Sequence, residues 1–421
     1  MSGGSLPLQD LPCLSLQNSS MLSQSRRTNK RKSRGFLTES LDTECTPTDL
    51  IQQWSPSLQH QRLISKGKEN NENHFVLARR SRRKTDHTSS VSWDHLPEEL
   101  LLRILLYLPL QDLLRMSTVC RRWRRLAFDE SLWQSVDLEG LTHMDSALQQ
   151  VLMTGVRRLR CPRSFVEKTH FTDSGPLQIV ELDLSSSIIP TTALESIICR
   201  CSLLEYLSLE GLQLSDTIIT SLSKNTNLLQ LNLSGCSGFS APPLADMFKS
   251  CNRIEQLNIS WCDFNNNHVK SVVENLSSAV TKLNLSGYRE TLTLDDVKVL
   301  VMRCPQIQTL DLSDSTLLMA DSFQILKQLK NLLHLSLSRC YHIHLAALTD
   351  LGQMFPLLTF LEVFGLTHDS QLTSLKKELP RISINSRPFS SIARPTPSCR
   401  PAGVFSDRTM WDRKCRLRVK L

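Results

Sequence analysis

Cysteine and histidine are the residues of this 421-residue chain that could most readily bind a metal ion or attack a substrate. The thirteen cysteines form no CxxC pair, and only one residue separates His342 from His344 in the stretch YHIH. Structural metal sites and reactive thiols usually show more definite spacing than this. The motifs GxSxG, GxxxxGK[ST] and HExxH are also missing from the sequence. The sequence therefore predicts a protein that uses no metal or other cofactor and is not an enzyme.

A repeat of about 26 residues, beginning near residue 180, positions most of these cysteines. Eight segments carry a Leu-x-Leu or closely related core, and their first leucines are 24 to 27 residues apart. That period is typical of leucine-rich repeats, in which each unit is a short strand followed by a helix. Because side chains alternate across a strand, both leucines should point inward and the residue between them outward. The first leucines are Leu182, Leu207, Leu231, Leu257, Leu283, Leu310, Leu335 and Leu361.

The repeat region extends beyond these eight segments. VDLEG at 136–140 and RLRCP at 158–162 resemble degenerate earlier units, and ISIN at 382–385 resembles a terminal strand. Between the strands, apolar residues recur at helical spacing, with Asp or Asn placed to begin the helices. The sequence predicts an α/β fold, a curved solenoid of about ten repeats over residues 136–385.

Six cysteines recur at fixed positions in the repeat, which indicates small buried slots rather than metal or redox chemistry. The pattern resembles the cysteine-containing leucine-rich repeats. Three of these cysteines lie five residues after a first leucine, and three lie six residues before one: Cys236, Cys262 and Cys340, then Cys201, Cys251 and Cys304.

Charge and composition divide the chain into an acidic body with basic ends. Residues 1–90 have a net charge of +6 and residues 381–421 one of +8, which leaves −6 for residues 91–380. Residues 1–90 are polar without an apolar period, so we expect a disordered regulatory region. Its basic clusters at 26–34 and 79–84 could be a localisation signal, a phosphate-binding arm or a solvated run.

The cysteines and the apolar stretches also bear on the compartment. An odd cysteine count without a signal-like opening predicts reduced thiols in the nucleus and cytoplasm. The longest apolar stretch is interrupted by Arg103 and Pro109, and it is shorter than the roughly 18 residues of a membrane span. No membrane partner is expected.

Residues 91–135 predict a small helical module before the repeats. Leu100, Ile104 and Leu108 recur at four-residue spacing, and a second apolar seam after Pro109 includes Cys120 and Trp123, between arginines on the solvated sides. Such a short module buries too little surface to be stable alone, so it needs a neighbouring domain or a partner.

This stretch resembles the F-box in its LP, spaced Ile and Leu, DL, VC, W and closing LW. The resemblance implies docking to the S-phase kinase-associated adaptor of a cullin–RING ubiquitin ligase; the alternative is an ordinary helical core. The residues assigned to the adaptor contact, or shared between it and the module's own core, are Leu96, Pro97, Leu100, Ile104, Leu108, Leu113, Val119, Cys120 and Trp123.

An F-box followed by leucine-rich repeats is typical of substrate receptors of that ligase class. Strings such as VSWDHLPEELL, LSGCSGFS and SIARPT resemble the family of vertebrate S-phase kinase-associated F-box proteins from about residue 74 to the end. That resemblance implies binding of phosphorylated cyclin-dependent-kinase inhibitors for polyubiquitylation and degradation, which promotes S-phase entry. It also implies an accessory cyclin-dependent-kinase-subunit protein, a cullin and a RING subunit, and a cyclin–kinase complex at the N-terminal region.

Candidate substrate contacts lie on the fourth residue after each first leucine, at the expected exit of the concave face. This column reads Ser, Gly, Gly, Trp, Gly, Asp, Arg, Gly, so Trp261, Asp314 and Arg339 interrupt a run of small residues. An exposed tryptophan beside charges is typical of a protein-binding hot spot. Tucking of Trp261 into a loop is the alternative. Neighbouring candidates are Tyr288, Arg289 and Tyr341.

The tail, residues 386–421, is expected to fold back across the concave face because it is basic and the body is acidic. By resemblance, Phe389 would anchor it and contribute to the accessory or substrate site, while Arg289 and Arg339 suit carboxylate recognition. A second interpretation of the whole chain remains open: a nuclear leucine-rich-repeat scaffold, or a nucleic-acid-binding protein that uses its basic ends. The receptor interpretation expects no nucleic acid.

Overall fold

A computed structural model describes residues 93–141, 145–167, 175–366, 368–395 and 417–418, which all belong to one compact unit. The predicted disorder of residues 1–90 and the basic clusters at 26–34 and 79–84 lie outside the described residues. In the described ranges, no helix is both long and apolar enough to cross a membrane.

Three short helices form the N-terminal module, after the single turn η2 (Trp93–His95). They are α2 (Glu98–Leu105), α3 (Leu110–Ser117) and α4 (Arg121–Ala127), followed by the turn η3 (Glu130–Leu132). Pro97 and Pro109 precede the first two helices, where a missing N–H leaves no helical bond unmade. Cys120 begins the third, since its Sγ accepts the Trp123 N–H at 3.4 Å.

In the part of the chain that the structure describes, a single parallel sheet of twelve strands runs through the repeat region, in the order β11 to β1 and then β12. The eight predicted leucines face one another across adjacent strands in unbroken register, which confirms the predicted solenoid. The degenerate units at 136–140 and 158–162 supply the first two strands. The strands are β1 (Ser135–Asp137), β2 (Arg158–Arg160), β3 (Glu181–Asp183), β4 (Tyr206–Ser208), β5 (Gln230–Asn232), β6 (Gln256–Asn258), β7 (Lys282–Asn284), β8 (Thr309–Asp311), β9 (His334–Ser336), β10 (Phe360–Glu362), β11 (Ser383–Ile384) and β12 (Leu417–Arg418).

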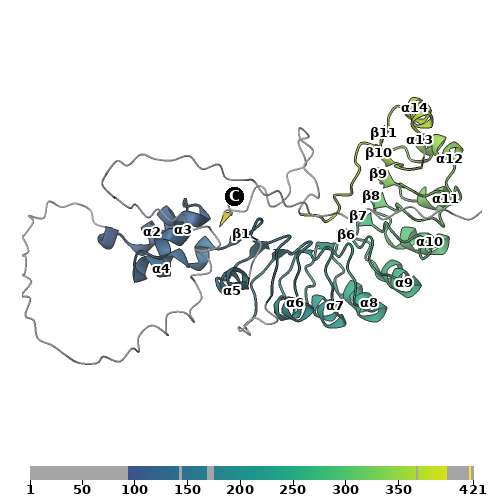
Figure 1. Ribbon diagram of the computed structural model, residues 1–421. Helices are drawn as coiled ribbons and strands as arrows, with labels where there is room; N and C mark the ends of the chain where they lie inside the picture. Colours follow the sequence, from purple (N-terminus) through teal and green to yellow (C-terminus); the bar gives the residue numbers. More distant parts are fainter. Residues whose placement is uncertain (1–92, 142–144, 168–174, 367, 396–416, 419–421) are drawn as a thin grey trace, which may run out of the picture. The chain divides into compact units, whose positions relative to one another are not determined.

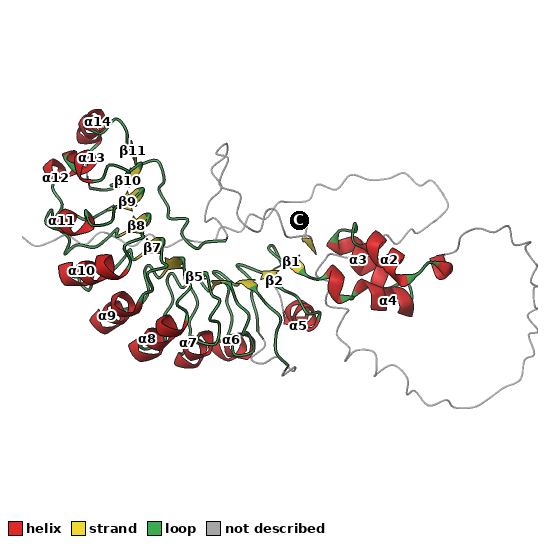
Figure 2. Cartoon of the chain, turned by 180° about the vertical axis from the view of Figure 1, so that it is seen from behind, coloured by secondary structure: helices red, strands yellow, loops and turns green. Residues whose placement is uncertain are grey.

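Helices form the outer layer of the repeat array and the strands its inner layer (Figures 1 and 2). Polar caps begin several of them: Ser215 Oγ accepts the Ile218 N–H, and Thr293 with Asp296 forms a reciprocal capping box. The helices are α5 (Asp145–Met153), α6 (Thr191–Ile198), α7 (Asp216–Leu222), α8 (Ala241–Ser250), α9 (Asn266–Asn275), α10 (Leu294–Arg303), α11 (Ser322–Leu326), α12 (Leu345–Thr349), α13 (Leu351–Met354) and α14 (Asp369–Glu378).

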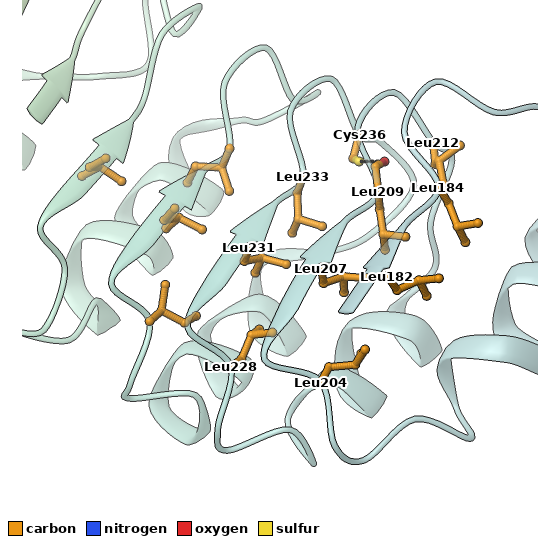
Figure 3. Packing of buried hydrophobic residues seen from close by; sticks show 14 of the residues in the cluster. Leu182, Leu184, Leu204, Leu207, Leu209, Leu212, Leu228, Leu231, Leu233 and Cys236 are labelled. Carbon is orange, nitrogen blue, oxygen red and sulfur yellow. Dashed lines mark hydrogen bonds between the residues drawn. The ribbon is translucent and has the colours of Figure 1, made fainter. Parts of the chain in front are cut away.

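The core lies between these two layers, where leucines of successive repeats stack (Figure 3). The six repeat cysteines are all buried, as predicted. Cys236 donates its S–H to the carbonyl of Leu209 in the preceding repeat, and Cys340 does the same to Leu312. Burial raises the pKa of Cys262 to about 11 and that of Cys340 to about 12, so both remain thiols at neutral pH.

The C-terminal tail crosses the inner face of the sheet after β11. Asn258 Nδ2 donates to the Ile392 carbonyl at 3.3 Å, and Arg394 Nε donates to Glu210 Oε2 at 3.0 Å. The chain then adds β12 beside β1, with Leu417 paired to Val136. The first strand in the sequence, β1, and the last, β12, are therefore neighbours in the sheet. The sequence analysis did not predict this arrangement.

Candidate functional site

The outer face of the three-helix module is apolar and exposed. Ile104 is 42% exposed, Leu100 and Val119 are also exposed, and Leu96 and Leu108 are half-buried. Exposed apolar side chains on one small module are typical of a protein-binding surface.

A hollow of about 210 Å³ opens on this face. Trp93 and Trp123 form its aromatic wall, with their rings edge to face and centroids 6.0 Å apart. The lining is composed entirely of apolar side chains: Trp93, Leu101, Ile104, Leu105, Leu108, Met116, Trp123 and Leu126.

Two expectations for this module need correction. Leu113 is 0% exposed, so it belongs to the core and cannot contact an adaptor at the surface. Cys120 is exposed at the start of α4 and is not part of the buried seam. The seam instead includes Leu101 and Leu105. Each lies one position after a residue of the predicted face, Leu100 or Ile104.

The arginines around Trp123 have partly structural roles. Arg122 donates to the Leu96 carbonyl at 2.6 Å and lies 3.8 Å from the Glu98 carboxylate. Arg125 also pairs with Glu98. Two of the four arginines therefore hold α4 against the beginning of α2, where the Leu96-Pro97 pair lies.

The column predicted at the exit of the concave face is a column of left-handed backbone. All eight of its members have φ between +56° and +96°, and Gly140 and Arg163 continue it in the first two repeats. Glycine is the default in this conformation, and other residues there cost about 1–2 kcal/mol. The small residues of the column are therefore explained by the turn, whereas its Trp, Asp and Arg require another reason.

Trp261 is 48% exposed at φ +58°, so it does not tuck into a loop. Its indole lies over Gly287 of the next repeat, where an added Cβ would come within 2.7 Å of the ring. Arg339 uses Gly365 in the same way, with its Cγ at 3.2 Å from an added Cβ. Trp261 and Arg339 thus each depend on glycine in the following repeat.

Asp314 is buried, which corrects its predicted role as a surface contact. Its Oδ2 accepts the Arg339 Nε–H at 2.8 Å, and its Oδ1 lies 3.5 Å from Arg289. The pKa of Arg339 is raised, and the hydrogen bond that Arg339 donates to Asp314 is the largest cause. The guanidinium groups of Arg289 and Arg339 remain substantially exposed. Asp314 therefore holds both arginines where a partner could reach them, and we call the surface formed by Trp261, Arg289, Arg339 and Tyr341 the rim.

Tyr288 is also buried, contrary to its predicted contact role. It stacks on Phe264 with centroids 5.5 Å apart, and its hydroxyl donates to the Ile259 carbonyl. Tyr341, in contrast, is exposed.

Phe389 is 63% exposed and does not anchor the tail within the chain. Among the described residues of the tail, Ile392, Ala393 and Leu417 are buried, while Arg394 contacts Glu210 and Ser234. Phe389 therefore lies open beside the rim, where it could contact a partner.

A second hollow, of about 260 Å³, lies between the tail and strands β7 to β10. The sequence analysis did not identify its polar floor, which includes Asp311, His334 and Glu362. These residues occupy strand positions that flank an inward leucine, so the alternation of strand side chains could have indicated them.

Comparison with known proteins also divides the chain into a helical module and a repeat region. Residues 93–139 match the F-box-like family, and residues 146–418 match the SKP2 LRR domain family. F-box/LRR-repeat protein 12 of Homo sapiens is 54% identical over 43 residues, 10% of this chain and 13% of that protein. F-box protein SKIP19 of Arabidopsis thaliana is 25% identical over 260 residues, 61% of this chain and 72% of that protein.

A solved structure of the yeast Rad7 and Elc1 complex aligns with a TM-score of 0.38 and 15% identity, over 62% of this chain and 77% of that one. The family matches cover both the helical module and most of the repeats. The chain belongs to the family of F-box proteins whose leucine-rich repeats are of the SKP2 type.

Proposed function

We propose that this chain is the substrate-recognition subunit of an SCF-type ubiquitin ligase. The observation that carries the proposal is the presence of two exposed binding surfaces on separate parts of one chain. One is the apolar face of the F-box, and the other is the rim formed by Trp261, Arg289, Arg339 and Tyr341. A receptor needs both, because it must hold the ligase and the substrate at once.

The F-box face would bind the adaptor, and through it the cullin and RING subunit. Ile104, Leu100 and Val119 offer exposed apolar area, and the hollow beside Trp123 could receive an apolar side chain. Apolar anchors that fill pockets dominate the energetics of such interfaces.

The rim and Phe389 would bind the accessory cyclin-dependent-kinase-subunit protein together with a phosphorylated cell-cycle inhibitor. Arg289 and Arg339 suit acidic residues beside the phosphorylated position, since guanidinium forms paired hydrogen bonds with carboxylates. Trp261 and Tyr341 supply the exposed aromatic area that protein interfaces favour. A cyclin–kinase complex at the N-terminal region, and residence in both nucleus and cytoplasm, belong to the same proposal.

In this role the chain performs no chemistry itself. It raises the rate of ubiquitin transfer by holding the substrate near an enzyme bound elsewhere in the assembly. Members of F-box/LRR families typically act as substrate adaptors, which agrees with this division of labour.

Reconstituted ubiquitylation tests the proposal. The full chain is mixed with adaptor, cullin, RING subunit and ubiquitin-charging enzymes, with a phosphorylated kinase inhibitor as substrate, with and without the accessory subunit. We expect ubiquitin chains only in the complete mixture, and loss of the adaptor complex with Ile104→Asp. Arg253→Gln, at an exposed residue that lines neither hollow, is the control. A chain that binds DNA with steep salt dependence and never binds the adaptor would instead favour the nucleic-acid interpretation.

A further inference from the structure

The hollow beneath the C-terminal tail has a polar floor with acceptor atoms that lack partners. Glu362 is 2% exposed, and its Oε2 has no hydrogen-bond partner among the described residues. Its Oε1 accepts the backbone N–H of Arg387 at 3.1 Å and the Ser386 hydroxyl at 3.4 Å. His334 Nε2, 3.9 Å from Glu362 Oε1, is also buried without a hydrogen-bond partner in the described structure. Buried polar atoms are nearly always satisfied, so these two atoms offer hydrogen-bonding positions to a group that enters the hollow.

The floor is acidic. Asp311, on strand β8 and separated from Glu362 by strand β9, lines the same hollow. Its Oδ1 accepts the Ser313 N–H at 3.0 Å, and it forms no ion pair within the described ranges. Burial lowers the pKa of His334 to about 4, so this imidazole is neutral at pH 7 and does not offset the carboxylates. Burial raises the pKa of Glu362 to about 7, although the backbone N–H and the charge of Arg387 lower it in part.

The arginines around the hollow are engaged elsewhere. Arg339 pairs with Asp314, and Arg394 pairs with Glu210. The guanidinium of Arg387 lies 4.1 Å above the Phe360 ring. The lining therefore holds two carboxylates that form no ion pair with an arginine in the described ranges, although the charges of Arg387 and Arg394 lie near enough to act on them.

Size and position restrict the occupant. A volume of about 260 Å³ is just below the range of roughly 300–1,000 Å³ typical of drug-sized ligands, so a side-chain-sized group fits best. Trp261 and Phe389 belong to the lining and are both exposed, so they lie where the hollow meets solvent. An incoming polypeptide could rest on these aromatic rings while one side chain enters.

We propose that this hollow is a cation-binding pocket that accepts a guanidinium or primary ammonium group, with Glu362 and Asp311 as its anionic acceptors. The group would donate to Glu362 Oε2, and its alkyl stem would pass the aromatic mouth. The pocket is a property of the tail and the inner face of the sheet, and it does not depend on the ligase role.

Calorimetry with small probes tests the pocket on the full chain. We expect N-acetyl-arginine methylamide to bind and its neutral isostere N-acetyl-citrulline methylamide to bind at least about tenfold more weakly, because hydrogen bonds between charged groups are the stronger ones. Agmatine, a free alkylguanidine, identifies the source: if it binds as tightly as the blocked arginine, the pocket takes a free small guanidine, and if more weakly, a side chain of a polypeptide. Both outcomes keep the cation pocket.

Variants locate the binding. Glu362→Gln and Asp311→Asn should each weaken the arginine probe about tenfold, whereas Glu274→Gln, an equal charge change on the exposed face of α9, should not. Glu362 also holds the tail through hydrogen bonds, so Glu362→Gln could weaken binding by loosening the tail. Asp311 forms no hydrogen bond with the described part of the tail, so the result with Asp311→Asn is free of that effect. Equal binding of arginine and citrulline probes, or unchanged binding in both variants, would overturn the proposal. Tight binding of inorganic phosphate that displaces the arginine probe would also overturn it.

Discussion

Substituting Gly287 by alanine should displace Trp261 and so weaken partner binding at the rim without direct change to any rim side chain. An alanine Cβ would lie 2.7 Å from Trp261 Cδ2 and 2.9 Å from Cε3, whereas carbon atoms in good contact are about 3.5–4.0 Å apart. The indole must therefore move by about 0.8 Å or more, and an off-rotamer position costs about 0.5–1.5 kcal/mol. The positive φ of +96° adds about 1–2 kcal/mol of backbone strain.

Gly211→Ala is the matched control for this experiment. Gly211 has φ +75° in the same column, yet the nearest atom to an added Cβ is Ser186 Cα at 3.9 Å. Both variants should lower the free energy of unfolding, measured by urea titration with circular dichroism. Only Gly287→Ala should also weaken binding of the accessory protein and substrate and shift tryptophan emission.

A double-mutant cycle gives the decisive number. In the Trp261→Ala background, Gly287→Ala should lower the free energy of unfolding by less, because the indole that it displaces is missing. The difference is a coupling energy of about 0.5–1.5 kcal/mol. Trp261→Ala keeps a Cβ at φ +58°, so the backbone strain at position 261 is unchanged in the cycle. A coupling energy near zero, together with normal rim binding by Gly287→Ala, would refute the dependence of Trp261 on the glycine.

Four further outcomes are expected. Ile104→Asp should abolish adaptor binding with little change in melting temperature, whereas Leu113→Ala should lower stability by about 2–5 kcal/mol because it opens a cavity in the module's core; similar stability losses for both would contradict this assignment. Arg394→Gln should speed proteolysis of the tail, monitored by mass spectrometry, because it removes the ion pair with Glu210; an unchanged cleavage rate would mean that other contacts hold the tail. Since the pKa of His334 is lowered by burial to about 4, its contribution to stability is present above the ordinary value of 6.5 and is lost as pH falls towards 4, so His334→Gln should flatten that loss in thermal melts. The pKa of Glu362 is raised to about 7, so its contribution is full below about 4.5 and is lost as pH rises through 7, and Glu362→Gln should flatten the opposite slope.

The solenoid was predictable because one regular pattern determines it. Each Leu-x-Leu segment fixes which side chains enter the core, and the period of about 26 residues fixes the stacking, so Leu182 and Leu207 face each other as expected. The two-residue strand β12 gave no such signal, since it lies some 30 residues beyond its nearest neighbour in sequence. The string RLR at 416–418 repeats the RLR of β2, which indicates a strand but not its pairing with β1.

The F-box face could not be assigned from spacing alone. Leucines occupy both Leu100 and Leu101, and a four-residue period fits the faces that begin at either position. The choice depends on the contacts of α2 with its neighbours, which bury Leu101 and leave Leu100 exposed. Resemblance named the correct module, but it could not separate the surface residue Ile104 from the core residue Leu113.

The rim was misread in part because contacts between repeats join residues about 25 positions apart. Asp314 looks like an exposed charge in the sequence, but Arg339 of the next repeat covers it. Tyr288 looks like an aromatic contact, but Phe264 of the preceding repeat stacks on it. Periodicity locates a residue within its own repeat and does not reveal which neighbour fills the space beside it.

The left-handed column links the fold of each repeat to the binding rim. Every repeat needs one such residue to leave its strand, and glycine meets that need with the least strain. Trp261 and Arg339 depart from glycine, and each has a glycine in the next repeat to make room for its side chain. Because a tryptophan at φ +58° costs stability, its retention beside Gly287 is better explained by a partner than by packing. The exposed indole and the two arginines held by Asp314 therefore form one rim whose strain and exposure both favour a binding role.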